Sequence, residues 1–296
     1  MERSDGILRM LKINFASSQD DVSGFSWKPV LKIFTYLEEE KADSMARESR
    51  TVLQFMVTDK ENPNSVLNIV TKARENARSV QDHITKELWQ CLNEFYHLMR
   101  DVRLIEWLYK EDPISVLDVL IRQCLLFYGT ADITMARGEG NSFMNIGKYL
   151  ERAIQTSDIL DVKFNMLNNN SDRTADATYL KYLLMSISGY ELYLKTYRSG
   201  FEAENVVEQI VLNNQFPRSV LYSINGMHRY HKLLNTGTNT ESYNRIDFIM
   251  GKLESKVQYS TAEVIMQQGL HEFLVGTIRE LNSTGIALDE SYFSFL

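Results

Sequence analysis

Two Glu-Arg dipeptides, Glu2-Arg3 and Glu151-Arg152, are the residues in this chain that are best suited to chemistry. Arginine presents a planar fork of donors that fits a carboxylate or a phosphate, and a neighbouring glutamate could act as an acid or a base. The same pair could instead form a structural network, in which arginine bridges a carboxylate and helix carbonyls. We favour the structural network and keep an anion or carboxylate site as the alternative.

Helical periodicity predicts that Arg152 is largely buried. Apolar residues recur at steps of three and four along 143–164 and form a core stripe. Arg152 points away from that stripe, but Ile159 and Val162 lie on roughly its own side, so this helix is apolar on two faces. Because a buried charge needs partners, we expect Arg152 to bond a carboxylate or a backbone carbonyl from another helix.

A second polar run contains Arg74, Glu75 and Arg78 and lies in a helix that is expected to begin near Pro63. Arg74 and Arg78 are one turn apart and share a face, which suits binding of a carboxylate or phosphate on a partner. Ordinary solvation of a helix face is the interpretation that we favour. The three residues stay candidate binding residues beside the two Glu-Arg pairs.

The histidines do not form a complete set of metal ligands in the sequence. Glu94 and His97 have the spacing of helical di-iron sites, but the motif occurs once, which favours a solvated His97. His228 and His231 have no evident spaced carboxylate or cysteine partner, which favours a surface helix. No Gly-rich phosphate loop or Ser-His-Asp arrangement is evident. We therefore predict no metal and no cofactor, and assign no catalytic residue.

Composition indicates an ordinary soluble protein. The 296 residues are 44% hydrophobic and carry a net charge of -7 at pH 7. Because the basic residues are dispersed in an acidic chain, nucleic acid and membranes are not expected as partners. Cys91 and Cys124 lie in apolar stretches without CxxC spacing, which predicts buried thiols. With no signal peptide and no apolar span uninterrupted by charge, a cytoplasmic location is expected.

Apolar residues recur at helical spacing almost throughout the chain, which predicts an all-α fold. Landmarks also repeat, since Glu151 follows Glu2 by 149 residues and Pro217 follows Pro63 by 154. We therefore predict a tandem-duplicated helical bundle of about twelve helices that forms a single domain over 1–296. Repeat 1 covers about 1–128 and lacks the start of its first helix. A connector covers about 129–140, and repeat 2 covers about 141–281.

The order of several short motifs resembles the alpha-E family, a predicted α-helical domain named for its Glu-Arg motif and typically found in tandem. The motifs are GKYLERA at 147–153, ENPNS at 61–65, ARENAR at 73–78, SGYE at 188–191 and FPRS at 216–219. The resemblance extends from Met1 to about Leu281. It implies a role in a bacterial, intracellular system of peptide synthesis or modification, in the company of ATP-grasp ligases and transglutaminase-like proteins.

Three functions remain open at this point. The first is a non-catalytic helical component of that peptide system, with an ATP-grasp ligase or a transglutaminase-like protein as partner. The second is an enzyme of the same system, with Glu151 as acid or base and Arg152 holding a carboxylate or phosphate in a helical cavity. The third is an oligomerisation module, for which a homo-oligomer and a large apolar surface patch are expected.

Overall fold

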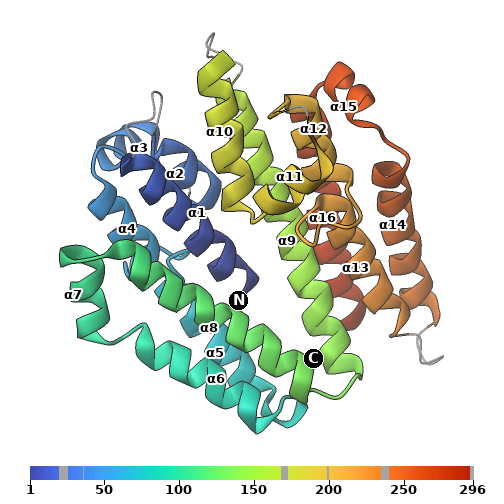
Figure 1. Cartoon of the computed structure of the whole chain (residues 1–296). Helices are drawn as coiled ribbons and strands as arrows, with labels where there is room; N and C mark the ends of the chain where they lie inside the picture. Colours follow the sequence, from blue (N-terminus) through green and yellow to red (C-terminus); the bar gives the residue numbers. More distant parts are fainter. Residues whose placement is uncertain (20–25, 36, 168–172, 199, 235–239, 294–296) are drawn as a thin grey trace. The chain divides into compact units, whose positions relative to one another are not determined.

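The computed structural model describes residues 1–19, 26–35, 37–167, 173–198, 200–234 and 240–293. These residues form sixteen α-helices and no strand, which confirms the predicted all-α class, with more helices than the twelve or so expected. The chain divides into two compact units, unit 1 over Met1–Ala136 and unit 2 over Arg137–Leu296 (Figure 1). Whether the two repeats form a single domain stays a prediction.

Unit 1 contains eight α-helices and a short 3₁₀ turn, η1 (Gln81–His83). The helices are α1 (Glu2–Gln19), α2 (Lys28–Phe34), α3 (Glu39–Met45), α4 (Ser49–Val57), α5 (Val66–Ser79), α6 (Lys86–Leu98), α7 (Val102–Lys110) and α8 (Pro113–Thr134). The first Glu-Arg pair lies at the beginning of α1. Pro113 is the first residue of α8, where its missing N–H is not needed.

Unit 2 also contains eight α-helices, with a π-helical segment, η2 (Glu208–Leu212), after the fourth. The helices are α9 (Glu139–Leu167), α10 (Arg173–Ser186), α11 (Tyr190–Thr196), α12 (Ala203–Val207), α13 (Val220–Lys232), α14 (Thr240–Gln258), α15 (Ala262–Gln268) and α16 (Leu270–Tyr292). The second Glu-Arg pair lies within α9, which begins at Glu139, twelve residues before Glu151.

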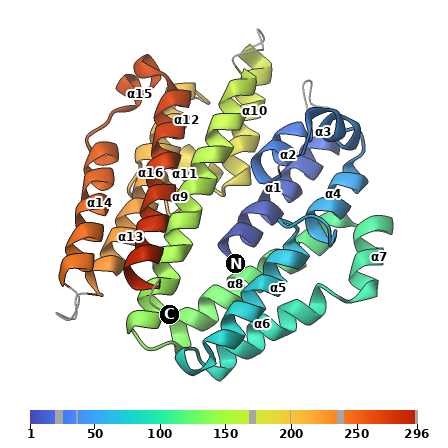
Figure 2. The ribbon, with the colours of Figure 1, turned by 180° about the vertical axis from the view of Figure 1, so that it is seen from behind.

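The helices of the two units have equivalent neighbours. In unit 1, α1 packs against α5 and α8, and α6 packs against both α5 and α8. In unit 2, α9 packs against α13 and α16, and α14 packs against both α13 and α16. Figures 1 and 2 show each set within its own unit. The repeated order and neighbours are what a duplication predicts.

The repeated Pro landmarks lie in equivalent turns before α5 and α13. The N–H of Ser65 donates to the carbonyl of Asn62 at 3.0 Å, and the N–H of Ser219 donates to that of Phe216 at 2.9 Å. Each serine then caps its helix, because its hydroxyl accepts a backbone N–H from the first turn. The two units therefore begin their fifth helix with the same local chemistry.

Part of the greater number of helices arises from breaks within 175–198 and 262–281, where helical periodicity predicts one helix each. Ser188, within the break between α10 and α11, has a φ of 58°, and Gly269 between α15 and α16 has a φ of 103°. Both values lie in the left-handed region, which interrupts an α-helix. The predicted connector at about 129–140 is mostly helical, since α8 continues to Thr134 and α9 begins at Glu139.

Among the described helices, α8 is the one that has the length and composition to cross a membrane. As expected, charged residues interrupt its apolar stretch, at Asp118, Arg122 and Asp132. A core helix has the same composition, and α8 packs against α1, α6 and α7. Its Asp118 also accepts a hydrogen bond from the Lys12 ammonium of α1 at 2.6 Å. These contacts make α8 a structural part of unit 1.

Candidate functional site

The Glu-Arg pair of unit 2 ties α9 to the turn before α13. The guanidinium Nη1 of Arg152 donates to the carbonyl of Pro217 at 3.0 Å, and the Thr156 hydroxyl donates to the carbonyl of Arg218 at 3.0 Å. Glu151 accepts a hydrogen bond from the Gln155 amide at 3.3 Å. The expected backbone carbonyl partner of Arg152 is confirmed. Arg152 is intermediate between buried and exposed.

The Glu-Arg pair of unit 1 contacts the equivalent turn with different atoms. Arg3 is exposed, and its Nη1 lies 3.5 Å from the Oδ1 of Asn64, the residue after Pro63. Glu2 is only 4% exposed and accepts a hydrogen bond from the Tyr128 hydroxyl of α8 at 2.6 Å. In both units the arginine of the pair therefore reaches the turn that starts the fifth helix.

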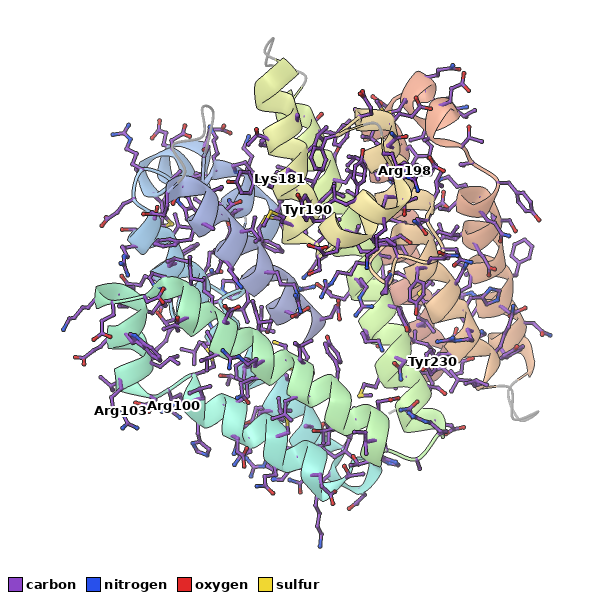
Figure 3. All side chains as sticks on the ribbon, viewed as in Figure 1. Arg100, Arg103, Lys181, Tyr190, Arg198 and Tyr230 are labelled. Atoms are coloured by element: carbon purple, nitrogen blue, oxygen red, sulfur yellow. The ribbon has the colours of Figure 1, made fainter. Side chains whose placement is uncertain are left out.

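Tyr149, two residues before Glu151, seats α9 on α13. A Cβ added to Gly226 would lie 2.8 Å from the Tyr149 ring, so only glycine lets the ring approach this closely. Tyr222 and Tyr230 lie one turn before and after Gly226, with ring centroids 6.1 and 6.0 Å from that of Tyr149. Tyr230 is labelled on α13 in Figure 3. The guanidinium of Arg152 lies 5.5 Å from the Tyr149 centroid, so the Glu-Arg pair borders this aromatic cluster.

The candidate residues Arg74, Glu75 and Arg78 separate into one packed and two exposed side chains. Arg74 donates through Nε to the Oδ1 of Asn93 on α6 at 2.8 Å and through Nη1 to Glu75 at 2.8 Å. Arg78 is exposed and lies 3.8 Å from Glu75. Because Arg74 is held within the α5–α6 pair, the local contacts favour a structural role for it.

Aromatic rings of α6 complete the environment of Arg74. Its guanidinium lies 4.6 Å from the Tyr96 centroid and 5.4 Å from that of Trp89, which gives cation–π attraction on both sides of Asn93. Arg100, labelled in Figure 3, donates to the Tyr96 hydroxyl at 2.6 Å. The α5–α6 pair is thus joined by a permanent cation on an aromatic surface.

His228 is buried between α13 and α14, so the expected surface histidine is wrong. Its Nε2 lies 2.9 Å from the Oδ1 of Asp247, and its Nδ1 contacts the Oε2 of Glu254. The ring is 5% exposed, whereas both carboxylates are partly exposed. Each of the two ring nitrogens of His228 therefore faces a carboxylate oxygen of α14.

His228 and Arg74 occupy equivalent places in their units. His228 follows Arg74 by 154 residues, the same interval that separates Pro217 from Pro63. Arg74 contacts Trp89, Asn93 and Tyr96 on α6, whereas His228 lies against Asp247, Gly251 and Glu254 on α14. Each set follows the spacing i, i+4, i+7, and the second follows the first by 158 residues throughout. A basic side chain on the fifth helix therefore joins it to the sixth in both units.

His231 extends the cluster of unit 2 into the core. It is 0% exposed, its ring stacks on Tyr243 with centroids 4.7 Å apart, and its Nε2 lies 3.1 Å from the Tyr292 hydroxyl. Its Nδ1 has no hydrogen-bond partner in the described part of the chain and lies 3.9 Å from the Oδ1 of Asp247. Burial lowers the pKa of His231 to about 4, against an opposing effect of Asp247. This ring is therefore neutral at pH 7.

Lys163 is a second buried titratable group in unit 2. Its side chain lies on α9 with the ammonium 5.1 Å from the Tyr179 ring centroid, and the residue is 7% exposed. Burial lowers the pKa of Lys163 to about 8. No carboxylate is paired with it among the described residues. The sequence reasoning missed this residue, although Lys163 lies one turn after Leu160 of the apolar stripe.

The remaining candidate residues are the possible metal ligands of α6 and the two cysteines. Glu94 and His97 are exposed on α6, and the described residues contain no group of three or more potential ligands that could hold a metal ion. Cys91 and Cys124 are buried, as expected. Burial raises the pKa of both thiols, so they remain protonated at neutral pH.

One charged pair was missed by the sequence reasoning. The Nδ1 of His271 on α16 lies 2.7 Å from the Oδ1 of Asp161 on α9. The two residues are 110 positions apart, so no local spacing could reveal the pair. They lie at a cavity of unit 2, and a second cavity of that unit is lined by residues of α12 and α15. Neither of these two cavities is lined by Glu151 or Arg152.

Comparison with known proteins places this geometry in a family. An uncharacterised protein of Mycobacterium bovis and two of Mycobacterium tuberculosis are each 22% identical to the chain over 196 residues. Each match covers 62% of this chain and 21% of the relative, so the chain spans about a fifth of the length of these relatives. No solved structure matches. A family model described as a predicted alpha-helical domain with a conserved ER motif matches residues 1–293, and the chain therefore belongs to the Alpha-E family.

Proposed function

We propose that the protein is a non-catalytic helical component of a bacterial, cytoplasmic system of peptide synthesis or modification. Its partner in this proposal is an ATP-grasp ligase or a transglutaminase-like protein. The observation that carries the non-catalytic role is the use of the Glu-Arg side chains within the scaffold. Arg152 holds the carbonyl of Pro217, and Glu2 accepts the Tyr128 hydroxyl. Groups held in this way position helices, and the surfaces of those helices remain for a partner.

The test compares folding with partner binding. The full chain and an ATP-grasp ligase of the same organism are purified, and any complex between them is measured by light scattering and calorimetry. The proposal expects a defined complex and an increase in ligase turnover when this protein is added. A ligase with unchanged turnover and no complex with this chain would contradict the proposal, and self-association of this chain alone would favour an oligomerisation module.

The variant Arg152→Ala separates the structural role from an enzymatic one. Loss of one charge-assisted hydrogen bond at a half-buried site is expected to lower the free energy of unfolding by about 1 kcal/mol. Ligase binding should fall only to the extent that folding falls. Arg103→Ala is the matched control, since Arg103 is 89% exposed on α7. A variant with unchanged thermal stability and complete loss of pathway activity would favour the enzyme hypothesis instead.

A further inference from the structure

A cavity of unit 2 lies where the last turns of α9 meet the junction of α15 and α16. Its volume is about 270 Å³, and its lining includes Asp161, Phe164, Met266, Leu270, His271 and Glu272. The volume lies just under the roughly 300–1,000 Å³ range of small-molecule sites. A ligand of nucleotide size would not fit, whereas a molecule with a few heavy atoms would.

One side of the cavity presents an oriented imidazole. The Oδ1 of Asp161 accepts from the Nδ1 of His271 at 2.7 Å and from the Asn165 amide at 3.3 Å. The Asp161 side chain is only 14% exposed, so the pair is anchored in the wall of α9. Because Nδ1 is engaged, Nε2 is the nitrogen available to a ligand. The hydrogen bond that Asp161 accepts, then the charge of Asp161, and less strongly the charge of Glu272 raise the pKa of His271. The ring is therefore a charged donor over a wider pH range than a free histidine.

An anionic group lies on the same junction. Glu272 is in the first turn of α16, and a Cβ added to Gly269 would overlap its Oε2. The carboxylate is therefore folded over Gly269, the residue before the helix, whose φ of 103° already excludes most side chains. Between the two charged groups, Phe164, Met266 and Leu270 supply apolar surface. A cation donor, an anion and an apolar wall thus line one small cavity.

We propose that this cavity binds a small zwitterion, namely a free α-amino acid with an apolar side chain. His271 binds its carboxylate, Glu272 binds its ammonium, and Phe164, Met266 and Leu270 contact its side chain. Asp161 is a positioning residue, because it holds the imidazole and does not itself contact the ligand. The site is independent of the proposed partner role, since it requires no second protein and is not lined by Glu151 or Arg152.

The probe for the test is L-leucine, titrated into the full chain and followed by ligand-observed NMR and calorimetry. Two fragments are the matched controls: 4-methylpentanoate lacks the ammonium, and 3-methylbutan-1-amine lacks the carboxylate. Because a hydrogen bond to a charged group contributes about 1.5–3 kcal/mol, each fragment should bind at least about tenfold more weakly than leucine. Absence of leucine binding at ~10 mM, or equal affinity for all three compounds, would overturn the proposal.

Variants assign the two charged groups. His271→Gln should weaken leucine binding about tenfold and leave the affinity for 3-methylbutan-1-amine unchanged. Glu272→Gln should also weaken leucine binding about tenfold, but it should leave the affinity for 4-methylpentanoate unchanged. Asp161→Asn should shift the pH dependence of leucine binding to lower pH, because His271 then loses its proton earlier. His97→Gln, on an exposed face of α6, is the control. Circular dichroism checks folding, and a folded His271→Gln protein with unchanged affinity for leucine would refute the assignment.

Discussion

Arg74 of unit 1 and His228 of unit 2 perform the same task with different chemistry. Each joins the fifth helix of its unit to the sixth, against residues spaced i, i+4, i+7. Arginine stays charged at any pH that a protein survives, and its neighbours are an amide and two aromatic rings. Histidine is charged only when protonated, and its neighbours are two carboxylates. The comparison teaches that one scaffold joins the same two helices with a permanently charged arginine in unit 1 and with a histidine in unit 2, beside the buried and titratable His231.

The first helices of the two units also differ, because unit 2 has a titratable side chain where unit 1 has a neutral one. Asn14 on α1 and Lys163 on α9 are equivalent at the interval of 149 residues, and both are buried. Asn14 is a neutral amide, whereas Lys163 is a titratable amine whose pKa burial lowers to about 8. Unit 2 therefore buries titratable groups at two positions where unit 1 has a neutral or a permanently charged one.

The largest effect is expected from removal of the buried amine. The pKa of Lys163 falls from 10.5 to about 8 on folding, so the folded state binds its proton less readily and is destabilised below pH 8. Lys163→Met should raise the free energy of unfolding at pH 7 by about 3 kcal/mol. Chemical denaturation at pH 7 measures this gain. Lys252→Met, on the exposed face of α14, is the control, and an equal gain in both variants would refute burial as the cause.

Acidification should act through His231. Its pKa falls from 6.5 to about 4 on folding, so the protein loses stability as the pH falls from 6.5 to 4 and is unaffected by this group above 6.5. The loss is about 3 kcal/mol when complete. The melting temperature of His231→Gln should therefore approach or exceed that of the native chain as the pH falls. His83→Gln, in the exposed η1 turn, should follow the native profile, and parallel profiles for all three proteins would contradict the account.

A smaller effect is expected where α9 meets α13. Gly226→Ala places a methyl group against the Tyr149 ring, and overpacking of this kind costs about 1–3 kcal/mol. Because alanine favours the helix over glycine by roughly 1 kcal/mol, the net loss in the free energy of unfolding is about 1 kcal/mol. Thermal unfolding measures the change.

Two alanine variants serve as controls for Gly226→Ala. Gly147→Ala on α9 should be neutral or stabilising, because nothing lies within 4 Å of its added Cβ. Lys72 on α5 is equivalent to Gly226 and is exposed, so Lys72→Ala should not lower the melting temperature. If Gly226→Ala were as stable as Gly147→Ala, the close approach of the two helices would not hold.

Much of the scaffold could be predicted from local patterns. Helical periodicity gave the class, and the repeats around Pro63 and Pro217 marked equivalent turns, because proline and the serine two residues later determine a helix start locally. Several breaks were missed, since Ser188 and Gly269 need left-handed backbone that only the surrounding packing reveals.

The candidate site was less predictable. His228 was assigned to a surface helix because its partners, Asp247 and Glu254, lie 19 and 26 residues away on another helix. The periodicity of α9 predicts that Arg152 is largely buried and has a partner on another helix, but it does not identify that partner as the Pro217 carbonyl in the turn before α13. Pairing between helices decides both cases, and periodicity along one helix does not contain that information.

Hydrogen exchange at pH 7 and pH 5, corrected for the intrinsic rates, tests the central comparison most directly. Protonation of His231 at pH 5 should lower the stability of unit 2 by ~2 kcal/mol, so amides of α13 and α14 should exchange about thirtyfold faster. Amides of α5 and α6, which Arg74 joins, should keep their protection. Equal changes in the two helix pairs, or no change in either, would contradict an acid sensitivity that buried His231 gives to unit 2 and that unit 1 lacks.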